Sequence, residues 1–372
     1  MAGGSMAAYL FIGCLNREAP YFQGARGKGI AVFAFDPETG AATAVTEATG
    51  VDNPTFLAVH PSNGCVYAIS EVFGWAEGVV SAYRFDPAKG RLVYLNKQPT
   101  LGSIAAHASF DRSGRYLFVA NYAIGDPDEL PGKSIAVFPV RADGGLDPAV
   151  ASAAYTGSGP NAARQERPHA HCIFPTPDNR FVVVADLGPD RLIAHPFDAA
   201  TGALSAGVES RLPPGAGPRH FVFHPNGRLA FVINELDSTI AALSFDAATG
   251  RFTVVDTVSA LPGVEGIESH CSSLQISPDG RFLYGANRGH DSIVIHAVDA
   301  ATGRLAFVGF APSGGRTPRD HMIDPSGRWL LACNQNSDVV TVFAVDQATG
   351  TLKDAGRPIA VGTPMCARLG AS

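Results

Sequence analysis

The chain has 372 residues with a formal net charge of −6, and 46 % of them are hydrophobic, which is enough for a sizeable core. Only 17 % of the residues are charged and no Lys/Arg-rich run occurs, so a nucleic acid, whose phosphates need a basic stripe, is not an expected partner. The sequence contains no apolar stretch of about 18 residues and no secretory signal, so we expect no membrane span and a cytoplasmic protein.

Two apolar strands are predicted near the N-terminus. They are AAYLFIG over residues 7–13 and GIAVFAF over residues 29–35, and a DPETG turn follows the second. We expect residues 1–6 to be a disordered extension and residues 7–372 to form a single domain. The loop between the two strands carries the segment ARGKG near Lys28.

A unit with a period of about fifty residues then repeats along the chain, which is typical of repeat architectures. Each copy has two apolar runs joined by a turn such as PSNG, PDN or PDG, then a third apolar run and a polar turn such as DAATG. The six copies begin at Pro54, His107, Pro168, Pro218, His270 and Pro318.

Each unit therefore predicts three clear β-strands and a weaker fourth, while helical periodicity is absent. Four short strands in a unit of forty to fifty residues are typical of a β-propeller blade. The chain ends with TPMCARL from Thr363, which predicts a first strand with no followers, while the N-terminal runs predict a second and third strand with no first. Joining them gives an all-β, seven-bladed β-propeller of four-stranded antiparallel blades, with its ring closed by both termini in one blade.

Antiparallel blades place the start of each first strand and the end of each second strand on the same face of the ring. Polar residues gather at these positions, although ionisable residues are scarce in the chain. The strand starts contribute His107, His169, Arg219, His220, His270, Arg319 and Met365. The strand ends contribute Glu71, Asn121, Asp186, Asn234, Glu235, Asn287, Arg288 and Gln335. Convergent polar groups at the mouth of a central channel predict a ligand site. The segment ARGKG and the loop from Ala123 to Lys133 lie on this face and could shape the pocket.

This cluster offers a base, a carboxylate and cations. His169 could act as general base or acid, and Glu235 could orient it or relay its proton. Arg219 and Arg288 could hold an anionic substrate or a developing oxyanion. We expect His107, His171, His220 and Arg319 to contribute to substrate binding. His171 lies two residues after His169, so both side chains are expected on the same side of the strand.

Other chemistries lack support in the sequence. It contains no G-x-S-x-G nucleophile motif, phosphate loop, H-E-x-x-H motif or dinucleotide fingerprint. We therefore expect no cofactor and no bound metal, although P-H-A-H at His169 and His171 has the form of a metal half-site. The six cysteines form no C-x-x-C pair and are expected to be small buried residues in a reducing compartment.

Purely structural roles remain open at several of these positions. Arg219 and Glu235 could form a simple salt bridge, and His169 could make a hydrogen bond between blades. Asn121 and Asp186 could cap the turns of their blades. His60 and His224 begin His-Pro turns and are expected to be structural.

The run GPRHFVFHPNGRLAFVINEL from Gly217 to Leu236 resembles the seven-bladed lactonase family, which includes propeller-type 6-phosphogluconolactonases and fungal 3-carboxy-cis,cis-muconate cyclising enzymes. The segments ISPDGRFLYGANR from Ile276, RQERPHAH from Arg164 and GTPM from Gly362 support the resemblance, which covers essentially the whole chain. The resemblance implies that His169, Arg219, Glu235 and Arg288 are the catalytic or substrate-binding groups. It also implies chemistry without a metal.

We therefore expect an enzyme that hydrolyses a small anionic sugar lactone, with 6-phosphogluconolactone as the leading substrate and a monomer as the working form. Cycloisomerisation of a carboxylated muconate is the alternative, and it would need further cations such as Arg319. A propeller that binds a protein partner is the third hypothesis. It requires exposed aromatic side chains at the polar mouth, where Phe73, Trp75 and Tyr122 are the candidates.

Overall fold

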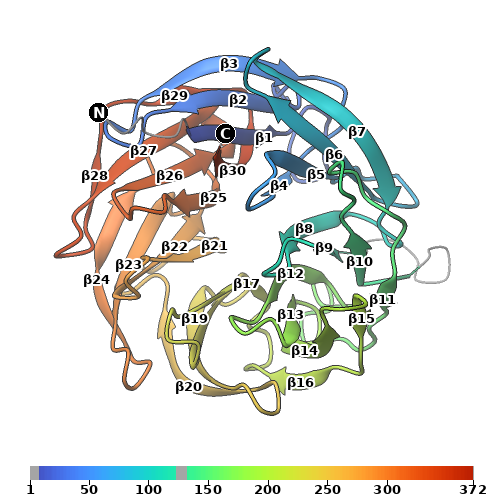
Figure 1. Cartoon of the computed structure of the whole chain (residues 1–372). Helices are drawn as coiled ribbons and strands as arrows, with labels where there is room; N and C mark the ends of the chain where they lie inside the picture. The colour runs from blue at the N-terminus through green and yellow to red at the C-terminus, as the bar shows by residue number, and fades with distance from the viewer. Residues whose placement is uncertain (1–7, 123–131, 372) are drawn as a thin grey trace, which may run out of the picture.

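The structure is a computed structural model that describes residues 8–122 and 132–371. Its strands form seven antiparallel sheets around a central axis, so the predicted seven-bladed β-propeller is confirmed (Figure 1). The predicted extension at residues 1–6 and the loop segment 123–131 lie outside the described residues. No helix within the described ranges is long and apolar enough to cross a membrane.

Blade 1 combines both ends of the chain and closes the ring. From the axis outward, its strands are β30 (Pro364–Ala371), β1 (Ala8–Cys14), β2 (Ile30–Phe35) and β3 (Ala42–Ala48). Strand β30 runs antiparallel to β1, with Leu10 opposite Leu369 and Ile12 opposite Ala367. The composite blade predicted from the two ends of the sequence is therefore confirmed, and β1 and β30 lie side by side in Figure 1.

Blades 2 to 4 follow in chain order, each with its first strand nearest the axis. Blade 2 contains β4 (Phe56–Val59), β5 (Cys65–Ser70), β6 (Val79–Asp86) and β7 (Arg91–Pro99). Blade 3 contains β8 (Ala105–Phe110), β9 (Tyr116–Asn121), β10 (Ile135–Pro139) and β11 (Ala151–Ala153). Blade 4 contains β12 (Ala170–Pro175), β13 (Phe181–Asp186) and β14 (Arg191–Asp198), and two short strands, β15 (Ala203–Leu204) and β16 (Val208–Arg211), pair with β14.

Blades 5 to 7 repeat this arrangement. Blade 5 contains β17 (Pro218–Phe223), β18 (Leu229–Asn234), β19 (Thr239–Asp246) and β20 (Arg251–Ser259). Blade 6 contains β21 (His270–Ile276), β22 (Phe282–Arg288), β23 (Ser292–Val298) and β24 (Leu305–Pro312). Blade 7 contains β25 (Pro318–Ile323), β26 (Trp329–Asn334), the 3₁₀ turn η2 (Gln335–Ser337), β27 (Val339–Val345), and the short outer strands β28 (Leu352–Asp354) and β29 (Ile359–Ala360).

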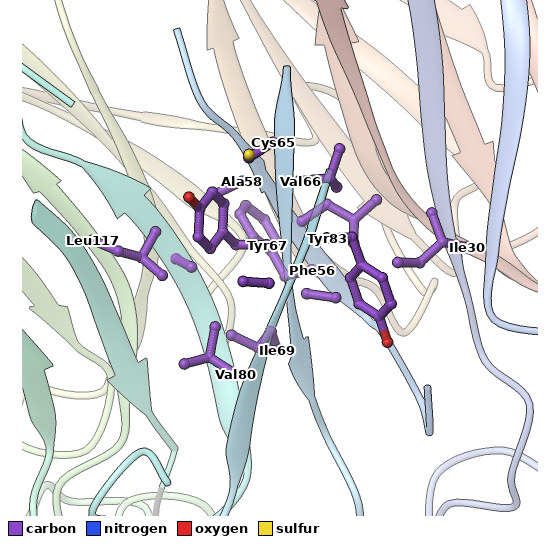
Figure 2. Packing of buried hydrophobic residues seen from close by; sticks show 14 of the residues in the cluster. Ile30, Phe56, Ala58, Cys65, Val66, Tyr67, Ile69, Val80, Tyr83 and Leu117 are labelled. Atoms are coloured by element: carbon purple, nitrogen blue, oxygen red, sulfur yellow. The ribbon is translucent and has the colours of Figure 1, made fainter. Parts of the chain in front are cut away.

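The hydrophobic core lies between neighbouring blades. Second strands such as β13 and β18 are buried along their whole length, whereas outer strands such as β20 are mostly exposed. Because neighbouring blades cover the inner strands on both faces, their sequences are continuous apolar runs, and the outer strands give the weaker signal. Figure 2 shows Tyr67 of blade 2 among apolar side chains that include Ile30 of blade 1 and Leu117 of blade 3.

Tight turns and polar caps fix the ends of the strands. Gly280 has φ +77° in the turn between β21 and β22, and a Cβ there would lie 2.5 Å from His224 Nε2, so glycine is required. At the opposite face, Asn121 Nδ2 donates to the carbonyl oxygens of Thr100 and Lys133 at 2.8 and 2.9 Å. The predicted capping role of Asn121 is therefore confirmed.

Candidate active site

A cavity of about 570 Å³ lies on the propeller axis, where the first strands begin and the second strands end. All seven blades contribute side chains to it, including Tyr21 from the loop between β1 and β2, Tyr122 after β9 and Arg164 before β12. Its volume is within the range of small-ligand sites. The predicted location of the ligand site thus coincides with this cavity.

β-Bulges aim several side chains into the cavity. The pairing of first and second strands shifts by one residue at Ala106, His171, Arg219 and Arg319, which have no opposite partner. All four of these residues line the cavity. A bulge breaks the alternation of side chains between the two faces of a strand, so it re-aims the extra residue.

Glu235 is the centre of an arginine cluster on one wall of the cavity. It follows β18, is 5 % exposed and accepts from Arg164 Nη2 at 2.6 Å through Oε1. Its Oε2 lies 3.0 Å from Arg288 Nη2 and 2.9 Å from Arg219 Nε. The Arg219 N–H is not well aligned with the carboxylate, so this contact is an ion pair rather than a good hydrogen bond. The predicted Arg219–Glu235 pair is present, and two further arginines extend it.

The arginines fix the charge of Glu235. Burial opposes its ionisation, but Arg288, Arg219 and Arg164 outweigh burial and hold the pKa of Glu235 well below its usual range. Burial and the charge of Arg288 lower the pKa of Arg219 to about 9, so its guanidinium remains protonated at neutral pH. One carboxylate facing three guanidinium groups leaves this wall positively charged.

His171, rather than His169, lines the cavity. Burial and Arg219 lower the pKa of His171 well below its usual value, so the ring is neutral at neutral pH, and its buried Nδ1 has no hydrogen-bond partner among the described residues. His169 lies beside the cavity wall: its Nδ1 is 2.8 Å from the carbonyl oxygen of Tyr122, and its ring stacks on the Tyr122 ring at 4.2 Å. Both rings contact the Tyr122 ring, His169 at 4.2 Å and His171 at 5.7 Å, but only His171 is among the lining residues, and the bulge at His171 interrupts the alternation.

His107 and His220 lie deeper on the axis and are not part of the cavity wall. Their rings are 5.6 Å apart, and His220 is 5.5 Å from the ring of His171. Burial lowers the pKa of His107 and of His220 well below the usual value, so both rings are neutral at neutral pH and pack beneath the residues that line the cavity. Arg319 does line the cavity, and it pairs with Glu71.

Sequence reasoning missed some residues of this site. Arg164 carries no strand signal, since it lies in the irregular segment before β12, and the only hint is its place four residues before Pro168. Tyr21 belongs to the same loop as the ARGKG segment, but Arg26 and Lys28 of that segment pair with Asp338 and Glu47 instead of reaching the cavity.

Residues 8–122 and 132–371 contain no evident metal-binding site. No three His, Cys, Asp or Glu side chains are grouped there in a way that could hold an ion. The six cysteines are buried and unpaired, as expected.

Comparison with known proteins identifies the family. The family model "Lactonase, 7-bladed beta-propeller" matches residues 9–369. The chain is 38 % identical to a 6-phosphogluconolactonase of Bacillus subtilis (strain 168) over 80 % of this chain and 81 % of that protein. It is 32 % identical to a 6-phosphogluconolactonase of Formosa agariphila over 85 % of this chain and 86 % of that protein. The crystal structure of a periplasmic gluconolactonase of Pseudomonas aeruginosa superposes with a TM-score of 0.86 and 32 % identity, covering 98 % of this chain and 99 % of that one.

The closed ring and its axial, arginine-rich cavity define a β-propeller enzyme with a small-molecule site. With these comparisons, the chain belongs to the seven-bladed β-propeller lactonase family. It is a lactonase, an enzyme that opens a cyclic ester with water. The expectation of an enzyme is confirmed, and the hypothesis of a propeller that only binds a protein is not supported.

Proposed function

We propose that the protein hydrolyses a phosphorylated sugar lactone, with 6-phosphogluconolactone as substrate and 6-phosphogluconate as product. The names of the relatives from Bacillus subtilis and Formosa agariphila support this choice. The main observation in support of a phosphorylated substrate is the charge of the cavity, where four arginines face two buried carboxylates, Glu71 and Glu235. This excess of positive charge complements a phosphate group, which carries nearly two negative charges at neutral pH.

The exposure of the three arginines around Glu235 suggests a division of roles. The side chains of Arg164 and Arg288 are 37 % and 17 % exposed, so they can reach a phosphate group near the mouth. The side chain of Arg219 is only 3 % exposed and lies by His171 at the floor, where it would stabilise the developing oxyanion. Glu235 holds the three guanidinium groups in place, because its carboxylate pairs with all three of them.

His171 serves as the general base in this proposal. The neutral ring accepts a proton from water while the water oxygen attacks the lactone carbonyl carbon. The tetrahedral intermediate then collapses, the bond between the carbonyl carbon and the ring oxygen breaks, and His171 returns the proton to the departing ring oxygen. His169, the residue favoured by the sequence for this task, acts as a positioning residue that supports Tyr122 in the cavity wall.

The test is hydrolysis of freshly generated 6-phosphogluconolactone beside unphosphorylated glucono-1,5-lactone, with spontaneous hydrolysis subtracted. We expect kcat/KM to favour the phosphorylated lactone, and Arg288→Met to reduce that preference by about tenfold or more, since charge-assisted hydrogen bonds contribute about 1.5–3 kcal/mol. Arg211→Met is the matched control, because the Arg211 side chain is 70 % exposed and Arg211 is not part of the cavity wall. Turnover of carboxymuconolactone with no turnover of either sugar lactone would favour the cyclising reaction instead.

A further inference from the structure

A second polar cluster faces the arginine cluster across the axis. It is centred on Glu71, which follows β5 in blade 2 and is 6 % exposed. Tyr21 Oη, from the loop of blade 1, donates to Glu71 Oε1 at 2.7 Å, and Thr55 Oγ1 donates to Oε2 at 2.7 Å. Arg319, from β25 in blade 7, completes the cluster. The Glu235 cluster belongs to blades 4, 5 and 6. Blade 5, which carries Glu235, lies across the ring from blades 1 and 2, whereas blade 6 adjoins blade 7 (Figure 1).

The two walls differ in net charge. Among the described residues, Glu71 pairs with a single guanidinium, that of Arg319, so this cluster is close to neutral, whereas Glu235 pairs with three. An anionic group is therefore drawn to the Glu235 wall and gains little at the Glu71 wall. The neutral wall suits polar groups without charge, which are the hydroxyl groups in a sugar lactone.

The contacts between Arg319 and Glu71 leave room for such hydroxyl groups. Arg319 Nη2 is 3.4 Å from each Glu71 oxygen, which is long beside the usual 2.7–2.9 Å of a charge-assisted hydrogen bond. Among the described residues, the hydrogen bonds and ion pairs of Arg319 go to Glu71 alone. A guanidinium has five N–H donors, so Arg319 keeps unused donors toward the cavity. Glu71 accepts two short hydrogen bonds, from Tyr21 and Thr55, and two long ones from Arg319, and a hydroxyl group of a ligand could replace the long ones.

An aromatic surface lies beside these donors and acceptors. Tyr21 is 41 % exposed as a residue, and its ring lies 4.7 Å from the Arg319 guanidinium and packs edge-on against Phe73 at 5.7 Å. Both rings line the cavity. The C–H face of a sugar ring packs well on an aromatic face while its hydroxyl groups reach a carboxylate or guanidinium at the edge.

We propose that Tyr21, Glu71 and Arg319 form a polyol subsite that recognises the hydroxyl groups of the lactone and so selects sugar lactones over unsubstituted ones. This inference rests on the proposed function, since it assigns the uncharged part of the same substrate. In this proposal the phosphate lies against Arg164 and Arg288, and the hydroxyl groups lie against Tyr21, Glu71 and Arg319.

The test uses binding, so that it does not depend on catalysis. Gluconate and hexanoate have the same chain length and charge, and only gluconate carries hydroxyl groups. We expect the purified protein to prefer gluconate in calorimetric titrations. Glu71→Gln and Tyr21→Phe should each lower the ratio of the two affinities by about tenfold or more, the size of a lost hydrogen bond to a charged group. The ratio is the readout because Glu71→Gln also makes the cavity more positive, which strengthens the binding of both acids alike.

Glu47→Gln is the matched control, because Glu47 lies on β3 of blade 1 and pairs only with Lys28 among the described residues. The control should keep the ratio of the unaltered protein. The subsite is wrong if the unaltered protein shows no preference for gluconate, or if both variants keep the preference. Failure of the proposed function would be seen separately, as absence of phosphorylated lactone turnover while gluconate is still preferred.

Discussion

His171 lines the axial cavity, whereas His169, two residues earlier, is directed to the carbonyl oxygen of Tyr122. The bulge in β12 separates them, since His171 has no opposite residue in β13. A carbonyl oxygen only accepts, so Nδ1 of His169 carries the proton, and its Nε2 lies 3.3 Å from Glu166 Oε2. Both nitrogens of His169 are thus engaged, while the buried Nδ1 of His171 has no hydrogen-bond partner among the described residues.

Kinetic measurements can distinguish the roles of His169 and His171. We expect His171→Asn to lower kcat for the phosphorylated lactone by about 10²–10⁴-fold, the usual contribution of a general base. His169→Asn should act more weakly and mainly on KM, because it disturbs the placement of Tyr122 rather than proton transfer. Both constants are measured by proton release at fixed pH. A larger loss of kcat in His169→Asn than in His171→Asn would indicate that His169 is the general base, as the sequence predicted.

Glu235 is expected to be required for stability as well as activity. Glu235→Gln leaves Arg164, Arg219 and Arg288 without a countercharge in a buried wall, and breaking a buried ion pair in this way costs about 3–5 kcal/mol. Urea unfolding gives the free energy of unfolding. The matched control is Glu268→Gln, which also lines the cavity, but whose side chain is 89 % exposed. Equal effects of the two substitutions would contradict a structural role for the arginine cluster.

The architecture was predictable because each blade repeats the same local signals. Turns such as SPDG before Arg281 and DAATG before Arg251 mark strand ends, and the continuous burial of inner strands makes them apolar runs. The composite blade was predictable because the last apolar run has no partner strand after it in the sequence, and in the structure this run, β30 from Pro364, pairs with β1. Local chemistry therefore specifies most of this fold.

The site was predictable only in part, because bulges and loops have no periodic signal. Arg219, Glu235 and Arg288 were found since antiparallel topology alone assigns their positions to one face. The orientation of His171 depends on one unpaired residue, which simple alternation cannot reveal. Tyr21 reaches the cavity through an irregular loop, and nothing in its sequence context indicates this contact.

The seam between β1 and β30 should be sensitive to loss of core volume. Ile12 of β1 is fully buried, and it pairs with Ala367 of β30. Ile12→Ala should lower the free energy of unfolding by about 2–5 kcal/mol, since the cavity left behind adds to the lost apolar burial. Val45→Ala in β3 of the same blade is the control: Val45 is 37 % exposed, and the change should stay within about 0.5 kcal/mol. A comparable loss in the two variants would show that the seam tolerates a cavity.

Buried histidines should make the protein less stable in mild acid. His321 Nδ1 lies 2.5 Å from Ser273 Oγ, and its Nε2 lies 3.1 Å from the carbonyl oxygen of Tyr284, so the neutral ring accepts one hydrogen bond and donates another. Burial lowers the pKa of His321 to about 4, against about 6.5 in the unfolded chain. Between these values only the unfolded chain gains the proton, so the free energy of unfolding falls as pH decreases from about 6.5 to about 4.

The expected loss from His321 alone is about 3 kcal/mol over this window, because each pKa unit corresponds to about 1.4 kcal/mol. Urea unfolding at intervals between pH 8 and pH 4 measures it. His321→Gln removes one titrating group, so its curve should lose stability with a shallower slope below pH 6.5 than the unaltered protein, whatever its stability at pH 8. His270→Gln is the control, since the His270 side chain is 41 % exposed. Parallel curves for His321→Gln and the unaltered protein would mean that His321 is already protonated in the folded state.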